Sequence, residues 1–205
     1  MEVFFNDLKR QFILNFIEKD RWKLMVTGLE NTLKITIVAA LIGIVIGILL
    51  ASIRSTYDKQ YETLKKHKGV KYYVLRTLNF IAQIYLTVIR GTPVVVQLLI
   101  AFFIIFASAK NGVAIAMLAF GINSGAYVAE IFRGGIMAID NGQFEAGYSL
   151  GFNYFQTMIF IVIPQVLKNV LPMLLNEFIA LLKETSVAGY VAVTDITRAG
   201  NVIRG

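Results

Sequence analysis

Long apolar blocks separated by short polar segments dominate the pattern of this chain. Residues 35–53 form a charge-free run of nineteen positions, which is long enough to cross about 30 Å of hydrocarbon as a helix. Gly43 and Gly47 within this run form a small-x3-small pair that predicts close packing of a neighbouring helix. Three further blocks occupy residues 77–109, 111–138 and 164–182. The pattern predicts an all-α membrane protein, a multi-span helical bundle with four spans visible in a single domain over residues 1–205.

The block at 77–109 is too long for one straight span, since a helix of this length would measure about 50 Å. Its one charged residue is Arg90, which opens the sequence Arg90-Gly91-Thr92-Pro93. Proline removes a backbone donor and disfavours helix at the preceding residue, so a break is expected here. The block is therefore either two short elements or one interrupted span.

The two ends of the chain show other patterns. In residues 1–23, apolar residues recur every three or four positions among charged ones, which predicts an amphipathic helix rather than a span. We expect this helix to lie in the membrane interface with Trp22 as an anchor; the alternative is a helix packed on the protein itself. Residues 183–205 are mixed and mostly polar, which suits a bent extension or an external loop.

Composition agrees with a membrane protein, because 57% of the 205 residues are hydrophobic and only 16% are charged. The basic residues behind the formal net charge of +7 lie in segments beside the apolar blocks. Residues 54–76 carry seven basic residues against two acidic ones, which predicts a cytoplasmic basic loop. No basic stripe with interleaved aromatic residues occurs, so nucleic acid is not an expected partner.

A polar, glycine-punctuated segment between the third and fourth blocks carries the most informative motif. Residues 143–151 predict a short helix outside the bilayer, and Pro164 suits the first turn of the helix that follows. The segment resembles the EAA loop of ABC-importer permeases, which reads E-A-A-x3-G-x9-I-x-L-P. The matching positions are Glu145, Ala146, Gly151, Ile161 and Pro164, while Gly147 replaces the second alanine and Ile163 the leucine. The alternative is an ordinary polar turn between spans.

The resemblance implies that residues 139–163 form a cytoplasmic loop whose coupling helix docks on an ATPase subunit. The residues implied in this contact are Gln143, Glu145, Ala146, Gly147, Ser149, Leu150, Gly151 and Phe152. The small residues among them are expected to leave a surface on which a side chain of another protein seats closely. Because this loop and the basic segment 54–76 both lie in the cytoplasm, an even number of spans must separate them. Residues 77–109 are therefore expected to supply one interrupted span.

Four further motifs lie along the chain: Gly28-Leu29-x2-Thr32-Leu33, Arg90-Gly91-Thr92-Pro93-x3-Gln97, residues 126–135, and Lys183-Glu184-Thr185-Ser186-Val187. They resemble the polar amino-acid permeases, the ABC-importer subfamily that serves histidine, arginine, glutamine, glutamate and opines. The resemblance implies the small permease fold, with a fifth span expected at the C-terminus. It also implies two cytoplasmic ABC ATPase subunits, a second permease copy or homologue, and an extracytoplasmic solute-binding protein as partners.

Charged residues within the apolar blocks are the candidate substrate site. Arg90, Glu130 and Glu177 should face the bundle interior, because an unpaired charge is costly in lipid. We expect Arg90 to bind a substrate α-carboxylate, and Glu130 or Glu177 to bind an ammonium group. The neutral hydrogen-bonding residues expected beside them are Gln97, Asn123, Ser124 and Tyr127. The alternative is that Arg90 and a glutamate only pair with each other.

No nucleophile–base constellation and no phosphate-binding G-x4-G-K-[ST] loop occurs in the sequence. We therefore expect no enzyme activity, metal or cofactor in this chain, with ATP and Mg²⁺ bound by the partner ATPase. The hypothesis is a multi-pass permease of the bacterial inner membrane that imports polar, and more narrowly basic, amino acids by alternating access. The alternatives are a passive channel or membrane scaffold without an ATPase, or a transporter of a metal chelate, sugar or peptide. The motif at 90–97 argues against these other cargoes.

Overall fold

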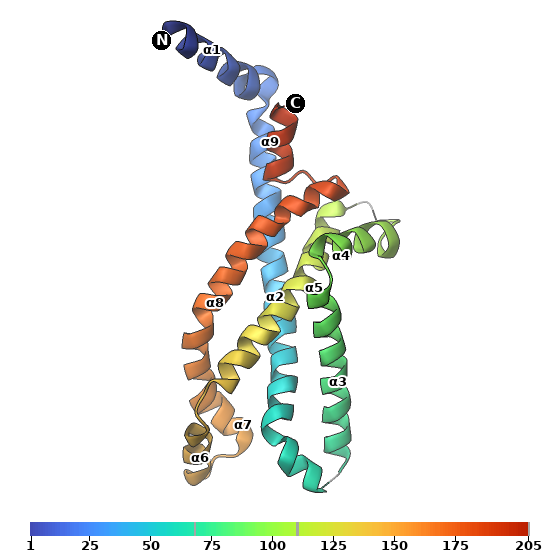
Figure 1. Cartoon of the computed structure of the whole chain (residues 1–205), viewed down its shortest axis with the longest axis vertical. Coiled ribbons are helices and arrows are strands. Elements are labelled where there is room, and N and C mark those ends of the chain that lie inside the picture. The colour runs from blue at the N-terminus through green and yellow to red at the C-terminus, as the bar shows by residue number, and fades with distance from the viewer. Residues whose placement is uncertain (68, 110, 205) are drawn as a thin grey trace. The chain divides into compact units, whose positions relative to one another are not determined.

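The structure is a computed structural model. It describes residues 1–67, 69–109 and 111–204, apart from the side chains of Lys19, Thr63, Leu64 and His67. Helices dominate the described chain (Figure 1). They are α1 (Glu2–Phe12), α2 (Trp22–His67), α3 (Val70–Gly91), α4 (Val94–Ile100), α5 (Gly112–Met137), α6 (Asn141–Ser149), α7 (Tyr154–Thr157), α8 (Ile163–Glu184) and α9 (Ile196–Arg204).

The chain divides into two compact units. The first consists of Met1–Val38, Val94–Phe120 and Leu181–Gly205, and the second of Ala39–Pro93 and Gly121–Ala180. The long helices α2, α5 and α8 each contribute to both units.

In the first unit, helix α9 packs on the N-terminal part of α2. The fully buried Asp195 caps α9, since its carboxylate accepts hydrogen bonds from the backbone N–H groups of Thr197 and Arg198 at 3.0 and 3.1 Å. Asn31 on α2 donates to the carbonyl of Thr194 at 2.9 Å. A Cβ at Gly28 would lie 2.7 Å from the Asp195 carbonyl oxygen, so glycine is required for this close approach. The predicted extension after residue 182 is thus a 3-10 turn followed by a packed helix.

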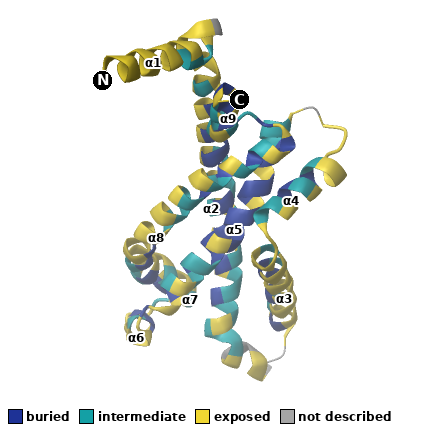
Figure 2. Ribbon diagram, turned by 45° about the horizontal axis from the view of Figure 1, so that its top comes forward, coloured by how far each residue is buried: buried dark blue, intermediate teal, exposed yellow. Residues whose placement is uncertain are grey.

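Helix α1 confirms the predicted N-terminal helix, although it ends at Phe12 and continues as a π-helical turn over Ile13–Ile17. None of the eleven residues of α1 is buried, and exposed residues cover it in Figure 2. Its position in the membrane interface stays a prediction.

In the second unit, α5 packs between α2 and α8. The apolar core contains Ala51 of α2, Val128, Phe132 and Ile136 of α5, and Val166 and Val170 of α8. The predicted small-residue face of α2 is confirmed at Gly43, where an added Cβ would lie 2.9 Å from the Ser124 hydroxyl of α5.

The prediction of a polar loop over 54–76 is wrong. Helix α2 continues to His67 and α3 begins at Val70, with Gly69 at its N-cap; Lys68 lies outside the described residues. Residues 54–67 contain no proline or glycine, so charge alone does not end the helix. Tyrosines also join the two helices, with the rings of Tyr61 and Tyr72 6.4 Å apart.

The helix around Pro164 begins earlier than expected. A capping box between Asn153 and Gln156 starts α7, and the helix passes through a π-helical turn over Met158–Val162 into α8. Pro164 does lie in the first turn of α8, as predicted, but within a continuous helical run. The wider π turn accommodates the proline, and the Gln165 side chain donates to the Ile161 carbonyl at 2.9 Å.

Among the described residues, three helical stretches are long and apolar enough to cross a membrane: 22–62, 112–137 and 154–191. Helix α3 together with residues 94–105 forms a fourth candidate if the pair is one interrupted span. The predicted interruption is confirmed, because helix is lost at Thr92 and Pro93.

Candidate functional site

A cavity of about 520 Å³ opens in the second unit between α3, α5 and α8. Four of the seven predicted substrate residues line it: Arg90, Tyr127, Glu130 and Glu177. The remaining lining residues are Ile131, Gly134, Gly135, Ala138, Asn169, Val170 and Met173. Most of this wall is apolar, so the charged groups are the features able to orient a polar ligand.

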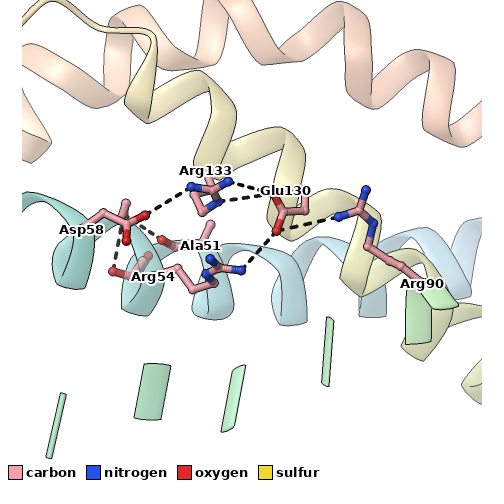
Figure 3. Close-up of polar contacts among 8 residues, drawn as sticks. Ala51, Arg54, Asp58, Arg90, Glu130 and Arg133 are labelled. Atoms are coloured by element: carbon pink, nitrogen blue, oxygen red, sulfur yellow. Dashed lines mark hydrogen bonds and ion pairs between the residues drawn. The ribbon is translucent and has the colours of Figure 1, made fainter. Parts of the chain in front are cut away.

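Glu130 is the centre of an ion-pair cluster (Figure 3). Its Oε1 lies 3.3 Å from Arg54 Nη1 and 3.8 Å from Arg90 Nη1. Its Oε2 lies 3.2 Å from both Nε and Nη2 of Arg133, one turn along α5. The pairing of Arg90 with a glutamate, which was the alternative to substrate binding, is therefore present within a larger cluster.

The cluster extends to Asp58, whose Oδ2 lies 3.2 Å from Arg133 Nη1 (Figure 3). Arg54, Asp58 and Arg133 are not among the site residues predicted from the sequence. The sequence does contain a signal for them. Once α2 is known to continue past residue 53, Arg54 and Asp58 lie four positions apart on one face of α2. Glu130 and Arg133 lie three positions apart on one face of α5.

Arg90 and Glu177 are held differently from Glu130. The Arg90 side chain is 45% exposed, the most exposed of the three arginines, and its guanidinium lies 5.7 Å from the Tyr127 ring centre. Glu177 accepts one hydrogen bond from the buried Ser124 hydroxyl at 2.9 Å. Both groups thus retain hydrogen-bonding capacity toward the cavity.

The other predicted site residues have different positions. Asn123 is buried on α5 and is absent from the cavity lining. Ser124 acts through Glu177 rather than lining the cavity itself. Gln97 belongs to α4 in the first unit, and it is not among the residues that line this cavity.

The predicted short helix between the third and fourth apolar blocks is confirmed as α6. Asp140 caps its first turn by accepting from the Gly142 N–H at 2.6 Å. A Schellman motif ends it: Phe152 N–H donates to the Gly147 carbonyl at 3.0 Å, and Gly151 N–H to the Tyr148 carbonyl at 2.9 Å. Gly151 has the positive φ of +81° that this motif requires.

One face of α6 packs on α7 and α8, and the other is exposed. Phe144 is buried and stacks on Tyr154, with ring centres 6.4 Å apart, while Gln143 accepts from the Gln165 side chain at 3.0 Å. Phe152 is half-buried, 6.0 Å from the ring of Phe160. The exposed residues of the predicted coupling set are Glu145, Ala146, Ser149, Leu150 and Gly151.

Gly147 differs from its predicted role on the docking surface. It is buried, and an added Cβ would lie 2.6 Å from the Cγ2 and Oγ1 atoms of Thr157. This contact explains the one departure inside the E-A-A triplet, since alanine does not fit here. The small size of Gly147 serves the packing of α6 on α7.

Replacing Gly147 with alanine is expected to destabilise the protein by about 1–3 kcal/mol through overpacking. Alanine would otherwise favour a helix by about 1 kcal/mol, so the sign of the change identifies the clash. Adding Thr157→Ala should restore stability, because the buried Thr157 hydroxyl has no hydrogen-bond partner among the described residues. Thermal unfolding in detergent measures all three variants. Gly134→Ala in α5 is the matched control. An added Cβ at Gly134 meets no atom within 4 Å, so this substitution should not destabilise the protein.

The basic segment and α6 lie at the same end of the second unit. Lys59 Nζ donates to Asn141 Oδ1 at 2.7 Å and lies 4.7 Å from the centre of the Phe144 ring. In Figure 1, the C-terminal end of α2, the N-terminal end of α3, and the helices α6 and α7 occupy the lower part of this unit. The two segments therefore lie close together, and the side of the membrane that they face stays a prediction.

Comparison with known proteins gives concordant matches. The profile of one family, described as "Binding-protein-dependent transport system inner membrane component", matches residues 43–201. A putative glutamine transport system permease protein, GlnP, of Rickettsia felis is 34% identical over 196 residues, which cover 94% of this chain and 81% of that protein. The arginine transport system permease protein ArtQ of Bacillus subtilis is 37% identical over 175 residues, covering 83% and 72% respectively.

The fold has a counterpart among solved structures. The crystal structure of an amino acid ABC transporter with histidines aligns with a TM-score of 0.74 and 36% sequence identity. The alignment covers 89% of this chain and 78% of that chain. The matched family region includes the cavity residues and α6.

Proposed function

The chain belongs to the family of binding-protein-dependent transport system inner membrane components, and we propose that it is the permease subunit of an ATP-driven importer of polar amino acids. The family membership confirms the predicted resemblance, and the structural match confirms the predicted fold class. The proposed substrate and partners rest on two further features, the cavity of the second unit and the exposed face of α6.

The cavity of the second unit carries the proposal. Every α-amino acid presents a carboxylate and an ammonium group, so an enclosure that contains both a cation and an anion suits its backbone. Arg90 supplies a partly exposed guanidinium, which suits a carboxylate, and Glu177 supplies a carboxylate oriented by Ser124. The proposed site therefore binds the amino-acid backbone, while the apolar wall contacts the side chain.

The ion pairs narrow the proposed cargo. Glu130 is surrounded by three arginines, so a cationic substrate side chain would meet a positively charged neighbourhood there. Among the described lining residues, Glu177 is then the carboxylate open to an ammonium group. This arrangement favours neutral polar amino acids, such as the glutamine named in one relative, over the basic ones predicted from the sequence.

The remaining parts of the importer are proposed from the same family membership. The exposed face of α6 would dock on a cytoplasmic ATPase that binds ATP and Mg²⁺, two of them in the assembly. A second permease copy or homologue would complete the path, and an extracytoplasmic binding protein would deliver the amino acid. Alternating access in the bacterial inner membrane is the transport mode that fits these partners.

Uptake into proteoliposomes that contain the full complex tests the site. Arg90→Gln and Glu177→Gln should each raise the KM for L-glutamine about tenfold or more, as expected for losing a hydrogen bond to a charged group. Lys168→Gln, a similar charge loss at an exposed position on α8 outside the cavity lining, should leave KM unchanged. Unchanged KM in both cavity variants would refute the site.

Co-purification tests the class of protein. An importer should bring an ATPase with it from its native membrane, whereas a passive channel or scaffold should not. Uptake of L-glutamine that needs no ATP would favour the channel.

A further inference from the structure

We propose that Asp58 and Lys59, adjacent residues of α2, are positioning residues that link the ion pairs of the cavity to the orientation of α6. The inference rests on the proposed function, in which α6 meets the ATPase. Besides its packing on α7 and α8, α6 then has two attachments: the loop that joins it to α5, and Lys59 of α2.

The first attachment is covalent. Only Ala138, Ile139 and Asp140 separate the end of α5 from α6, and Ile139 is buried in the core of the second unit. Since Asp140 also caps α6, the N-terminus of α6 follows any movement of α5. The packing of Phe144 on Tyr154 and of Gln143 on Gln165 holds α6 against α7 and α8, so a contact with α2 is a separate constraint on α6.

The second attachment comes from Lys59 on α2. Its ammonium group donates to the Asn141 side chain at 2.7 Å and lies 4.7 Å from the centre of the Phe144 ring. Asn141 and Phe144 are three positions apart and therefore share one side of α6. A charge-assisted hydrogen bond and a cation–π contact thus hold the first turn of α6 against α2.

Asp58, the neighbouring residue, faces the cavity cluster. Its carboxylate lies 3.2 Å from Arg133, and Arg133 also pairs with Glu130, which lines the cavity (Figure 3). Arg54, one turn before Asp58, pairs with Glu130 as well. Ion pairs therefore tie α2 to α5 on the cavity side of the same helical turn that holds α6.

The loop to α5 and the Lys59 contact to α2 are two of the supports of α6, and α2 and α5 can move relative to each other. When Arg90 or Glu130 exchanges partners, the pairs between α2 and α5 rearrange. Because α2 is a continuous helix, Lys59 moves with Asp58, and the direction of α6 changes relative to α5. Substrate binding in the cavity then affects nucleotide binding at the ATPase through these ion pairs, and nucleotide binding affects substrate binding in the same way.

The experiment uses the complete complex and the absence of cysteine in the chain. A single cysteine at Ala138, in the cavity lining, is labelled with a water-soluble maleimide, with and without ATP plus vanadate. The parent should show a nucleotide-dependent labelling rate. Lys59→Met should reduce this nucleotide effect by roughly fivefold or more, with the amount of co-purified ATPase unchanged. Lys59→Arg, which keeps the charge and the donors, should restore it.

Matched controls distinguish loss of the Lys59–Asn141 contact from a general effect of removing a charge from α2. Lys65→Met removes the same charge from the same helix, where the ammonium group contacts only the Tyr61 ring among the contacts seen, and it should behave as the parent. Asn141→Ala removes the acceptor from the α6 side and should match Lys59→Met. Combining Asp58→Asn with Lys59→Met should reduce the effect no further than the more severe single change.

Two results would overturn the link. One is a parental nucleotide effect in both Lys59→Met and Asn141→Ala; the other is an equal loss in Lys65→Met. A parent that binds no ATPase would instead overturn the proposed function, and the link with it, so the two failures are distinguishable.

Discussion

Replacing Gly151 with valine is expected to abolish ATP-coupled uptake while leaving insertion into the membrane intact. Gly151 has a φ of +81°, and its N–H and that of Phe152 close the Schellman motif at the end of α6. A left-handed conformation costs about 1–2 kcal/mol for an ordinary residue and more for a β-branched one. The last turn of α6 would therefore unwind, and with it the exposed face that we propose meets the ATPase.

The choice of substitute separates backbone conformation from side-chain size. An added Cβ at Gly151 would meet no atom within 4 Å, so the chain itself does not exclude a larger residue. Gly151→Asn should retain most of the uptake, because asparagine tolerates the left-handed region. Uptake and ATPase co-purification are measured in parallel. Normal coupled uptake by Gly151→Val would contradict the prediction, and equal loss in Gly151→Asn would point to size instead.

Replacing Glu130 with glutamine is expected to lower the free energy of unfolding by about 2 kcal/mol. Arg54, Arg90 and Arg133 would lose their shared carboxylate, and arginine cannot release its proton to compensate. Removing one partner of a fully buried pair costs about 3–5 kcal/mol; the effect here is smaller because these arginine side chains are 15% to 45% exposed.

A second substitution tests the cause. Arg54 is the least exposed of the three arginines, so Glu130→Gln combined with Arg54→Met should recover much of the lost stability. Glu62→Gln, an exposed carboxylate one turn beyond Asp58 on α2, is the control and should have little effect. Thermal unfolding of the purified protein in detergent gives the comparison. Equal stability of Glu130→Gln and the parent would show that the cluster is not a structural tie.

The features that could be predicted from the sequence are those set by local chemistry. Hydrocarbon thickness and the length of apolar blocks located the long helices, and the missing N–H of Pro93 located the break between α3 and α4. The short helix predicted at 143–151 is found at Asn141–Ser149, shifted by two residues, because the Asp140 cap begins it earlier and the positive φ of Gly151 ends it.

The misses come from contacts between distant residues. The charge pattern predicts an end of the helix near Arg54, although charged residues can leave the membrane without leaving the helix. Because of that error, Arg54 and Asp58 were not predicted as residues of the site. The role of Gly147 depends on Thr157 in another helix, which no pattern around residue 147 reveals. Arg54 likewise contacts Glu130 from far upstream in the chain, whereas the pairing of Arg90 with a glutamate was one of the predicted alternatives.

The packing of α9 on α2 has a consequence for biogenesis. Asn31 and Thr32 receive their partners from Thr194 and Ile196, more than 160 positions later in the chain. While the ribosome is still translating the intervening segments, both polar side chains lack these hydrogen-bond partners. The native first unit can therefore form only after residues 194–196 have been synthesised, long after α2 has left the ribosome.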